Sequence, residues 1–363
     1  MKAVIIAGGL GTRLRPLTYN TPKPIVPVAN RAFVLHQIEL LRQHGITEII
    51  LNLHYLAAEI KKVLGDGSRY GVKIQYSIED HPLGTAGAVK LAEEFFDGDS
   101  MVVFNGDALT DINIAQIIEY HKKKKARATL TLTRVDDPTH YGVVLMDENG
   151  KVSRFVEKPS WEQVANLGAE ERPANAINAG IYVLEPAIFK DVPKGVEYSF
   201  ERQLFPSLLE KGEPVYGFVS DRYWIDIGKP EQYRQAHEAI LRGEVAVKIY
   251  GARSDGRVWI GDEANFDKTA KLIGPAIIGR GVTIAAETKV QDYTVLGDET
   301  WLGRETTISR AVVWRGTRIG SHVNLNGCII GFDCVIEDNV TIGDGVVLAD
   351  HSLIKRGSLL CSR

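Results

Sequence analysis

The chain has 363 residues, which is too long for one ordinary domain and long enough for two hydrophobic cores. Apolar residues make up 44% of it and charged residues 25%, as in ordinary soluble globular proteins. Its net charge of −3 gives no overall attraction to nucleic acid or to an anionic membrane, so a site for an anion must be local.

The cysteines and the N-terminal residues predict a cytoplasmic protein. Cys328, Cys334 and Cys361 are the only cysteines, and they have neither a Cys-x-x-Cys unit nor the spacing of zinc ligands. The apolar run after Lys2 breaks at Gly8, which is too short for a signal sequence, and no apolar stretch approaches the roughly 18 residues of a membrane span. We therefore expect no secretion, no membrane insertion and no nucleic-acid partner.

From Lys2 to about Arg134, apolar strands alternate with amphipathic helices. This alternation is typical of a Rossmann-like α/β fold, in which a mostly parallel sheet carries helices on both faces. The expected strands are 3–7, 48–53, 72–78, 101–104 and 129–135. The expected helices are 33–44, 56–64, 85–96 and 114–125, the last capped by Asn113.

The next stretch predicts further strands and helices added to the same sheet, which would receive a second substrate. Two strands at 141–146 and 152–156 flank a turn, and a polar segment from Trp161 to Ala176 predicts a short helix and a loop. The remaining expected elements are strands at 180–184, 215–219 and 223–226 and helices at 200–211 and 231–241.

Near Gly243 the pattern changes, because apolar residues begin to recur every six positions. A six-residue period fits neither an α-helix nor an ordinary strand, but it fits a hexapeptide β-helix of about five to six coils with one inward aliphatic residue per side. Two five-residue steps, to Val313 and to Ile330, interrupt the series. The members of the series are Ile260, Phe266, Leu272, Ile278, Ile284, Val290, Leu296, Leu302, Ile308, Val313, Ile319, Leu325, Ile330, Ile336, Ile342, Leu348, Ile354 and Leu360.

The repeat resembles the hexapeptide-repeat family, whose parallel β-helices are left-handed. We therefore expect a catalytic domain at 1–243 and a left-handed parallel β-helix at 244–363. The edges and ends of such a helix commonly pack against copies of itself or against the catalytic domain, and a homo-oligomer is the hypothesis we adopt.

A glycine-rich loop follows the first expected strand, running from Ala7 to Thr18 as AGGLGTRLRPLT and continuing to Pro22-Lys23-Pro24. Glycines let backbone N–H groups turn toward an anion, and Arg13 and Lys23 add positive charge. The loop lacks the Gly-Lys-Ser/Thr of a Walker A motif. Leu14 stands where a dinucleotide-binding fingerprint needs its third glycine, which weakens that alternative too.

This loop resembles the signature of the sugar-1-phosphate nucleotidyltransferases, also called nucleotide-sugar pyrophosphorylases. Later motifs follow in the order typical of that family: Leu83-Gly84-Thr85-Ala86-Gly87, Asn105-Gly106-Asp107, Tyr141-Gly142, Glu157-Lys158-Pro159, Asn178-Ala179-Gly180 and Trp224-Ile225-Asp226-Ile227-Gly228. Among the members, the likeness is strongest to mannose-1-phosphate guanylyltransferases that carry a β-helix.

The resemblance implies an enzyme that joins a nucleoside triphosphate to a sugar 1-phosphate and releases pyrophosphate. It places catalysis at Arg13, Lys23 and Asp107, and an Mg²⁺ ion at Asp107 and Asp226. It implies nucleotide contacts from Ala7, Gly8, Gly9, Gly11, Thr12, Gly84, Thr85 and Gly106. It implies sugar-phosphate contacts from Gly142, Glu157, Lys158 and Asn178. Because a phosphate oxygen is already ionised, such a reaction needs positioned cations and no general base.

The choice of substrates leaves alternatives. Thymidylyltransferases of the family usually carry a glutamine in this loop, and none occurs between Glu79 and Lys90, which disfavours dTTP. The form Gly84-Thr85-Ala86-Gly87 resembles that of guanylyltransferases, which favours GTP with mannose 1-phosphate, giving GDP-mannose. UTP (or dTTP) with glucose 1-phosphate is the alternative pair. Two other classes remain open: a non-catalytic regulatory subunit that senses a nucleotide sugar, and an acyltransferase that would use His322 or His351 of the repeat as its base.

Overall fold

The computed structural model describes residues 1–165, 176–254 and 256–362. They form two units, each with its own core: Met1–Gly9 with Gln37–Trp224, and Leu10–His36 with Ile225–Arg363. The glycine-rich loop therefore passes from the first unit to the second between Gly9 and Leu10. The division at residue 243 remains a prediction about domains.

The first unit is built on a nine-stranded sheet with the central order β10-β9-β11-β6-β1-β4-β5, while β8 pairs with β11 and β12 pairs with β8. Strands β6, β1, β4 and β5 are parallel, and β9, β10 and β11 add antiparallel pairs. The strands are β1 Ala3–Ile6, β4 Glu48–Leu53, β5 Lys73–Ile78, β6 Met101–Asn105, β8 Ala128–Arg134, β9 Gly142–Met146, β10 Val152–Glu157, β11 Ala176–Leu184 and β12 Val215–Val219.

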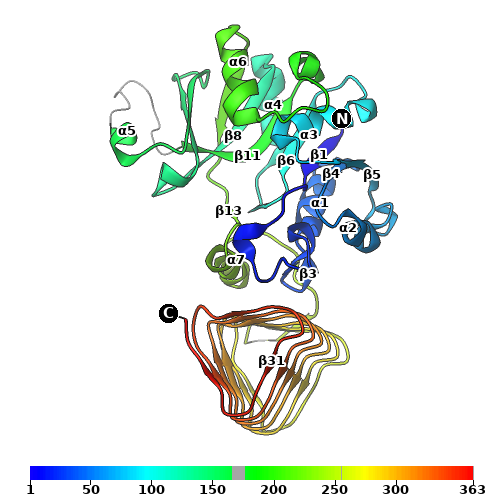
Figure 1. Ribbon diagram of the computed structural model, residues 1–363, viewed down its shortest axis with the longest axis vertical. Coiled ribbons are helices and arrows are strands. Elements are labelled where there is room, and N and C mark those ends of the chain that lie inside the picture. The colour runs from blue at the N-terminus through cyan, green and yellow to red at the C-terminus, as the bar shows by residue number, and fades with distance from the viewer. Residues whose placement is uncertain (166–175, 255, 363) are drawn as a thin grey trace. The chain divides into compact units, whose positions relative to one another are not determined.

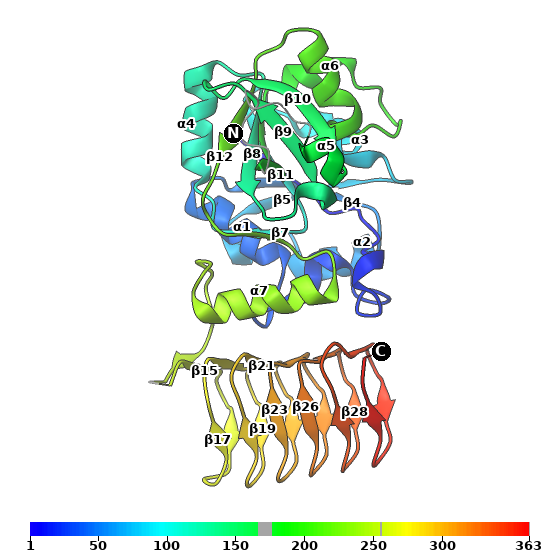
Figure 2. The same cartoon turned by 90° about the vertical axis from the view of Figure 1, so that its left-hand side faces the viewer.

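Helices cover both faces of this sheet, as the sequence predicts (Figures 1 and 2). The hydroxyl of Thr129 in β8 lies 2.9 Å from the ring of His121 in α4, whereas the next residue, Leu130, packs in the core with Val89 of α3 and Phe205 of α6. Successive strand residues point to opposite faces, so α4 lies on one face and α3 and α6 on the other. The α-helices are α1 Val34–Gln43, α2 Ala57–Leu64, α3 Gly84–Leu91, α4 Ile114–Lys124, α5 Trp161–Ala165 and α6 Phe205–Glu210.

Shorter elements complete this unit. Asn113 caps α4 as expected, since its side chain accepts a hydrogen bond from the backbone N–H of Gln116 at 3.1 Å. The short elements are η3 Ser68–Tyr70, η4 Ala92–Phe95, β7 Ala108–Thr110, η5 Pro138–His140, η6 Pro186–Asp191 and the π-helix η7 Phe200–Leu204.

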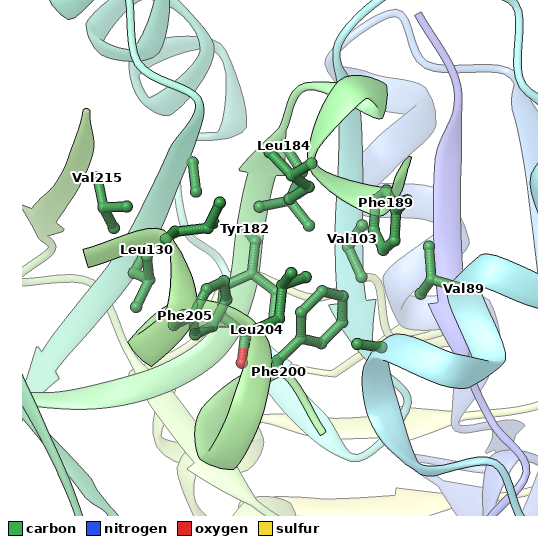
Figure 3. Packing of buried hydrophobic residues seen from close by; sticks show 14 of the residues in the cluster. Val89, Val103, Leu130, Tyr182, Leu184, Phe189, Phe200, Leu204, Phe205 and Val215 are labelled. Atoms are coloured by element: carbon green, nitrogen blue, oxygen red, sulfur yellow. The ribbon is translucent and has the colours of Figure 1, made fainter. Parts of the chain in front are cut away.

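The prediction of one helix at 200–211 is wrong for its first turn, because residues 200–204 form the π-helix η7 and the α-helix α6 begins only at Phe205. Pro206 has no N–H to donate to the carbonyl four residues earlier, and the wider turn puts residues five positions apart on one face. The rings of Phe200 and Phe205 consequently stack 5.3 Å apart, and both pack against Tyr182 (Figure 3). These three rings lie at the centre of the core between the sheet and α6.

Three other expected elements differ in extent. The helix expected at 85–96 ends at Leu91 and continues as the 3₁₀ turn η4. Strand β11 begins at Ala176 and not at Gly180, whose positive φ of 71° lies where the register with β8 shifts. Of the segment expected as a short helix and loop, α5 is observed, and residues 166–175 lie outside the described residues.

The second unit contains a left-handed parallel β-helix, whose coils are triangular in Figure 1 and stacked in Figure 2. Its first side is β14 Ala252–Arg253, β15 Val258–Ile260, β18 Ala276–Ile278, β21 Thr294–Leu296, β24 Val312–Val313, β27 Ile329–Ile330 and β30 Val347–Leu348. Its second side is β16 Asn265–Phe266, β19 Thr283–Ile284, β22 Trp301–Leu302, β25 Arg318–Ile319, β28 Val335–Ile336 and β31 Leu353–Ile354. Its third side is β17 Lys271–Leu272, β20 Lys289–Val290, β23 Thr307–Ser309, β26 Asn324–Asn326, β29 Thr341–Ile342 and β32 Leu359–Leu360.

The apolar six-residue series forms the interior of this helix, with one exception. Phe266 lies in the first coil, where no earlier coil covers it, and is 42% exposed. A second series of smaller residues fills the corners, four positions after most members of the first series and three positions after Ile308 and Leu325. Cys328 and Cys334 belong to it, so these cysteines serve as small core residues.

The other elements of this unit belong to the glycine-rich loop, to the hairpin that follows it and to the helix before the β-helix. They are η1 Thr12–Leu14, η2 Lys23–Ile25, β2 Pro27–Val28, β3 Arg31–Ala32 and α7 Pro230–Arg242, with β13 Trp224–Asp226 leading into them. In the described part of the chain, no helix is both long and apolar enough to cross a membrane.

Glycines in the β-helix let neighbouring coils approach, which predicts a selective effect of alanine. An added Cβ at Gly297 would lie 2.3 Å from the backbone nitrogen of Arg315, whereas at Gly256 the nearest atom would be 4.0 Å away. We expect Gly297→Ala to lower the free energy of unfolding by about 1–3 kcal/mol or more, because backbone must move. Thermal unfolding with Gly256→Ala as the control checks this; equal melting temperatures would contradict it.

Candidate active site

The beginning of the glycine-rich loop packs against Glu79. The backbone N–H of Ala7 donates to the carbonyl of Asn52 at 2.9 Å. An added Cβ at Gly8 would lie 2.8 Å from Oε1 of Glu79, whereas at Gly9 it would meet nothing within 4 Å. Packing therefore explains the glycine at position 8 but not the exposed one at position 9, where a ligand could approach the backbone.

Further along the loop, two cations converge on one carboxylate. Nζ of Lys23 lies 3.4 Å from Oδ1 of Asp226, and Nη2 of Arg13 lies 3.6 Å from Oδ2 of the same residue. The side chains of Lys23 and Asp226 are only 11% and 15% exposed, whereas that of Arg13 is 59% exposed. The structure thus brings together three of the residues that the sequence singled out.

The loop's own hydrogen bonds hold it in this shape. Gly11 has a positive φ of 63°, and its carbonyl accepts from the Thr18 hydroxyl at 2.7 Å and from the Leu14 N–H at 3.0 Å. Thr12 and Arg13 lie exposed in the short turn η1 that follows. The backbone is therefore fixed while its outer side chains face solvent.

The turn that carries Asp107 is held by a glutamine. The N–H of Gly106 donates to the Ile6 carbonyl at 2.8 Å, and an added Cβ there would lie 2.5 Å from that oxygen. Nε2 of Gln37 donates to the carbonyls of Asn105 and Ala108, each at 3.0 Å. Asp107, half-buried, is thus placed at the end of β6 beside the end of β1.

The loop from Leu83 to Gly87 is tied to a distant segment. The carbonyl of Tyr198 accepts from the N–H groups of Ala86 and Gly87 at 2.9 Å each, and an added Cβ at Gly84 would lie 2.8 Å from it. The Leu83 N–H donates to Oε2 of Glu79 at 2.9 Å. Glu79 therefore lies against both this loop and Gly8.

The hydroxyl of Thr85 is already engaged within the protein. It donates to Oε2 of Glu201 at 3.1 Å and accepts from the backbone N–H of Phe200 at 2.8 Å. Oε1 of Glu201 in turn accepts from the hydroxyl of the buried Tyr182 at 3.2 Å. A nucleotide contact at Thr85 would therefore rely on its backbone or on the second lone pair of the hydroxyl.

Three of the expected sugar-phosphate residues, Gly142, Glu157 and Lys158, lie together around the carboxylate of Glu157. Burial, and secondly the nearby negative charge of Glu201, raise the pKa of the half-buried Glu157. Nζ of Lys158 lies 3.9 Å from Oε1 of Glu157, and its side chain is 61% exposed. An added Cβ at Gly142 would lie 2.6 Å from the ring of Phe155 and 2.9 Å from Oε2 of Glu157, so this glycine leaves room for both side chains.

Asn178 is partly engaged by its own strand. Its Nδ2 donates to the hydroxyl of Tyr182 at 2.7 Å, and its Oδ1 accepts from the N–H of Gly180 at 3.0 Å. One amide hydrogen and one lone pair of the amide oxygen remain for a sugar hydroxyl.

Three residues of the site were missed by reasoning from the sequence: Gln37, Glu79 and Glu201. Glu79 directly follows β5, the position where parallel sheets present site residues, so its place in the chain was a usable signal. Gln37 and Glu201 lie in helices, and nothing in their spacing separates them from ordinary surface residues.

The donor set suits a hard divalent cation. Asp107 lies just beyond β6 and Asp226 is the last residue of β13, and each offers carboxylate oxygens, which Mg²⁺ prefers. Within the described residues, no group of three or more His, Cys, Asp or Glu could hold a metal ion. Each carboxylate by itself therefore has the chemistry of an Mg²⁺ ligand.

The chain is similar to known proteins along nearly its whole length. Residues 2–243 match the nucleotidyl transferase family, and residues 255–362 match the family described as GMPPB C-terminal domain. A UTP–glucose-1-phosphate uridylyltransferase from Synechocystis is 35% identical, over 96% of this chain and 92% of its own length. A probable mannose-1-phosphate guanylyltransferase 1 from Oryza sativa is 34% identical, over 99% and 96%.

Solved structures resemble part of the chain. The crystal structure of HddC from Yersinia pseudotuberculosis complexed with GMP-PN has a TM-score of 0.54 and 33% identity, and covers 65% of this chain and 97% of that one. A putative glucose-1-phosphate thymidylyltransferase from Bacillus anthracis has a TM-score of 0.59 and 27% identity, and covers 68% and 97%.

Glu79 predicts a pH-dependent stability. Burial raises the pKa of Glu79, so the folded protein holds this proton to a higher pH than the unfolded chain does. At pH values between the pKa of Glu79 in the unfolded chain and its higher pKa in the folded protein, the folded state binds more protons than the unfolded state. The stability that protonated Glu79 contributes is therefore lost as pH rises through this range. Glu79→Gln resembles the protonated form, so its melting temperature relative to wild type should increase from pH 4 to pH 7. A relative stability that is independent of pH would contradict the assignment.

Proposed function

The chain belongs to the nucleotidyl transferase family, and we propose that it is a mannose-1-phosphate guanylyltransferase that makes GDP-mannose and pyrophosphate from GTP and mannose 1-phosphate. It is an enzyme that transfers a nucleotidyl group to a sugar 1-phosphate. The main structural support for this chemistry is that Lys23 and Arg13, from the glycine-rich loop and its continuation, both lie close to the carboxylate of Asp226 in β13. The relatives of that name, which match over nearly the whole chain, support the choice of substrates.

The reaction needs two anions to be brought together. An oxygen of the sugar 1-phosphate attacks the α-phosphorus of the triphosphate, and the bond from that phosphorus to the oxygen that leads to the β-phosphate breaks. The attacking oxygen is already ionised, so no residue has to remove a proton. The residues must instead offset the repulsion between the anions and stabilise the charge that develops on pyrophosphate.

The cations of the loop suit this task. Arg13, largely exposed, would bind the triphosphate, and Lys23, largely buried, would neutralise the departing pyrophosphate. Asp226 keeps both in the loop without substrate, because each cation has an anionic partner there. The backbone at Gly9 would face the phosphates, since no atom of the protein lies within 4 Å of where a side chain would stand.

The remaining residues would hold the sugar and the metal. Lys158 would bind the phosphate of the sugar, Glu157 would accept hydrogen bonds from its hydroxyls, and Asn178 would contribute its remaining amide hydrogen. Asp107 and Asp226 would hold a divalent metal, which we propose to be Mg²⁺ and which neutralises phosphate charge when bound.

Two further statements remain proposals. We propose a homo-oligomer that forms through the β-helix, supported by the exposed apolar residues Trp301, Val335 and Leu353, which share one outward-facing row of its second side with Arg318. A cytoplasmic location is supported by three free cysteines, two of them buried.

Asp107→Asn should lower the turnover number by at least about two powers of ten, because the loss of its charge weakens both metal binding and phosphate positioning. Asp221→Asn, at a carboxylate whose side chain is 88% exposed, is the matched control and should behave as wild type. Pyrophosphate release measured across an Mg²⁺ titration checks this. Rates near wild type at saturating Mg²⁺ would contradict the role of Asp107.

A uridylyltransferase acting on glucose 1-phosphate is the second candidate, because one relative of that name is 35% identical over 96% of the chain. Pyrophosphate release should be measured for GTP, UTP, dTTP and ATP, each with mannose 1-phosphate and glucose 1-phosphate. We expect the highest kcat/KM for GTP with mannose 1-phosphate. A higher value for UTP with glucose 1-phosphate would replace the proposal by the alternative, and no turnover with any pair would overturn both.

A further inference from the structure

The hydroxyl of Tyr233 joins the loop segment that follows Lys23 to the β-helix. Tyr233 lies in α7 and is fully buried. Its hydroxyl donates to the carbonyl of Pro27 and accepts from Nε1 of Trp314 at 2.9 Å. Trp314 directly follows β24 on the first side of the β-helix and is 1% exposed. One hydroxyl therefore connects β2 with a coil of the β-helix.

The segment between Lys23 and Pro27 has little freedom of its own. The N–H of Val26 donates to the carbonyl of Lys23 at 3.2 Å, which closes the turn η2. The carbonyl of Val26 accepts from Phe33 at 3.0 Å, and β2 pairs with β3 from Pro27 onward. A change in the position of the Pro27 carbonyl would consequently be passed to Lys23, only four residues away.

A second bond holds the same hairpin to the β-helix. Nδ2 of Asn30 donates to the carbonyl of Leu296 at 2.7 Å. Ala29 and Asn30 at the tip of the hairpin both have positive φ angles, 49° and 61°, which are unfavourable for alanine. Such a turn persists when its surroundings support it, and the Leu296 carbonyl supplies this support.

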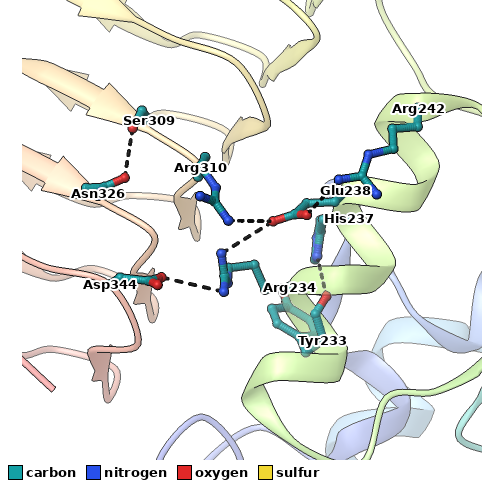
Figure 4. Close-up of polar contacts among 9 residues, drawn as sticks. All are labelled: Tyr233, Arg234, His237, Glu238, Arg242, Ser309, Arg310, Asn326 and Asp344. Atoms are coloured by element: carbon teal, nitrogen blue, oxygen red, sulfur yellow. Dashed lines mark hydrogen bonds and ion pairs between the residues drawn. The ribbon is translucent and has the colours of Figure 1, made fainter. Parts of the chain in front are cut away.

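Helix α7 is itself anchored on the β-helix (Figure 4). Glu238 pairs with Arg310 at 3.8 Å, and Arg234 pairs with Asp344 at 3.5 Å. Arg234 and Glu238 also pair with each other at 3.3 Å along α7. Because these contacts reach two different coils, α7 presents the Tyr233 hydroxyl from a fixed position.

We propose that Trp314 and Tyr233 are positioning residues for the reaction, through which the β-helix sets the place of Lys23 at the triphosphate. This inference rests on the proposed function. It assigns the β-helix a part in binding the triphosphate and pyrophosphate, beyond stabilising the fold or forming an oligomer.

Tyr233→Phe tests the proposal, because it removes the hydroxyl and keeps the ring. A matched control is Thr317→Val within the β-helix. The Thr317 hydroxyl is also fully buried, donates to the Gly331 carbonyl at 3.1 Å and accepts from the N–H of Cys334 at 3.3 Å. Both variants therefore lose a buried hydroxyl that makes two hydrogen bonds, and a purely structural role would make them behave alike.

We expect Tyr233→Phe to raise the KM for the triphosphate, and the KM for pyrophosphate in the reverse reaction, by about five-fold or more. The kcat should fall, whereas the KM for the sugar 1-phosphate should stay within about two-fold of the wild-type value. Thr317→Val should show a similar fall in melting temperature with all kinetic constants within about two-fold of wild type. Equal kinetic effects in the two variants, or an effect confined to the sugar 1-phosphate, would overturn the proposal.

Two more variants make the test independent of how well Tyr233→Phe folds. Trp314→Phe should add less than about two-fold to the kinetic effect of Tyr233→Phe, since both act through one hydroxyl. Asn30→Gly, which tolerates the positive φ and removes the bond to Leu296, should raise the same two KM values. Unchanged KM values in Asn30→Gly and Tyr233→Phe refute the inference if wild type is active, whereas an inactive wild type refutes the proposed function itself.

Discussion

The site depends on one ionic arrangement, in which the carboxylate of Asp226 lies between Lys23 and Arg13. Lys23 and Asp226 are 203 residues apart in the chain, and their side chains are nearly buried, so solvent screens their attraction weakly. Without the carboxylate, the two neighbouring cations of the loop would repel each other. With it, the loop can fold before any substrate binds and still present positive charge.

Close backbone approach explains most glycines around this site. Gly106 is pressed against the carbonyl of Ile6, Gly84 against that of Tyr198, and Gly8 against the carboxylate of Glu79. These three glycines are therefore required by packing, whichever ligand the loops hold. Gly9 is different, because a side chain there would meet no protein atom. Among these four, it is the glycine that packing within the protein does not explain.

The β-helix combines a repetitive interior with specific contacts on one side. Its corners are filled by small residues, and the hydroxyls of four buried threonines, Thr288, Thr300, Thr306 and Thr317, donate to glycine carbonyls, as Thr288 does to Gly303 at 2.7 Å. Burial in such a corner raises the pKa of the Cys328 thiol to about 12, so this cysteine is chemically inert at neutral pH. On the first side, by contrast, Trp314 and the Leu296 carbonyl contact residues outside the repeat.

The sequence by itself determined the alternation of strands and helices, the extent of β4 and β12, the six-residue interior of the β-helix and the residues of the glycine-rich loop, because each follows from local periodicity or from a contiguous motif. It could not show that the helix expected at 200–211 begins with the π-helix η7, or that Phe266 is exposed at the end of the β-helix. Nor could it show that Gln37, Glu79 and Glu201 hold the turn of Asp107 and the loop from Leu83 to Gly87 in place. It also could not show that Tyr233 connects the hairpin after Lys23 to Trp314. Only the tertiary structure decided these points, because each depends on groups distant in the chain meeting at hydrogen-bond distance, and no spacing within a single segment encodes such a meeting.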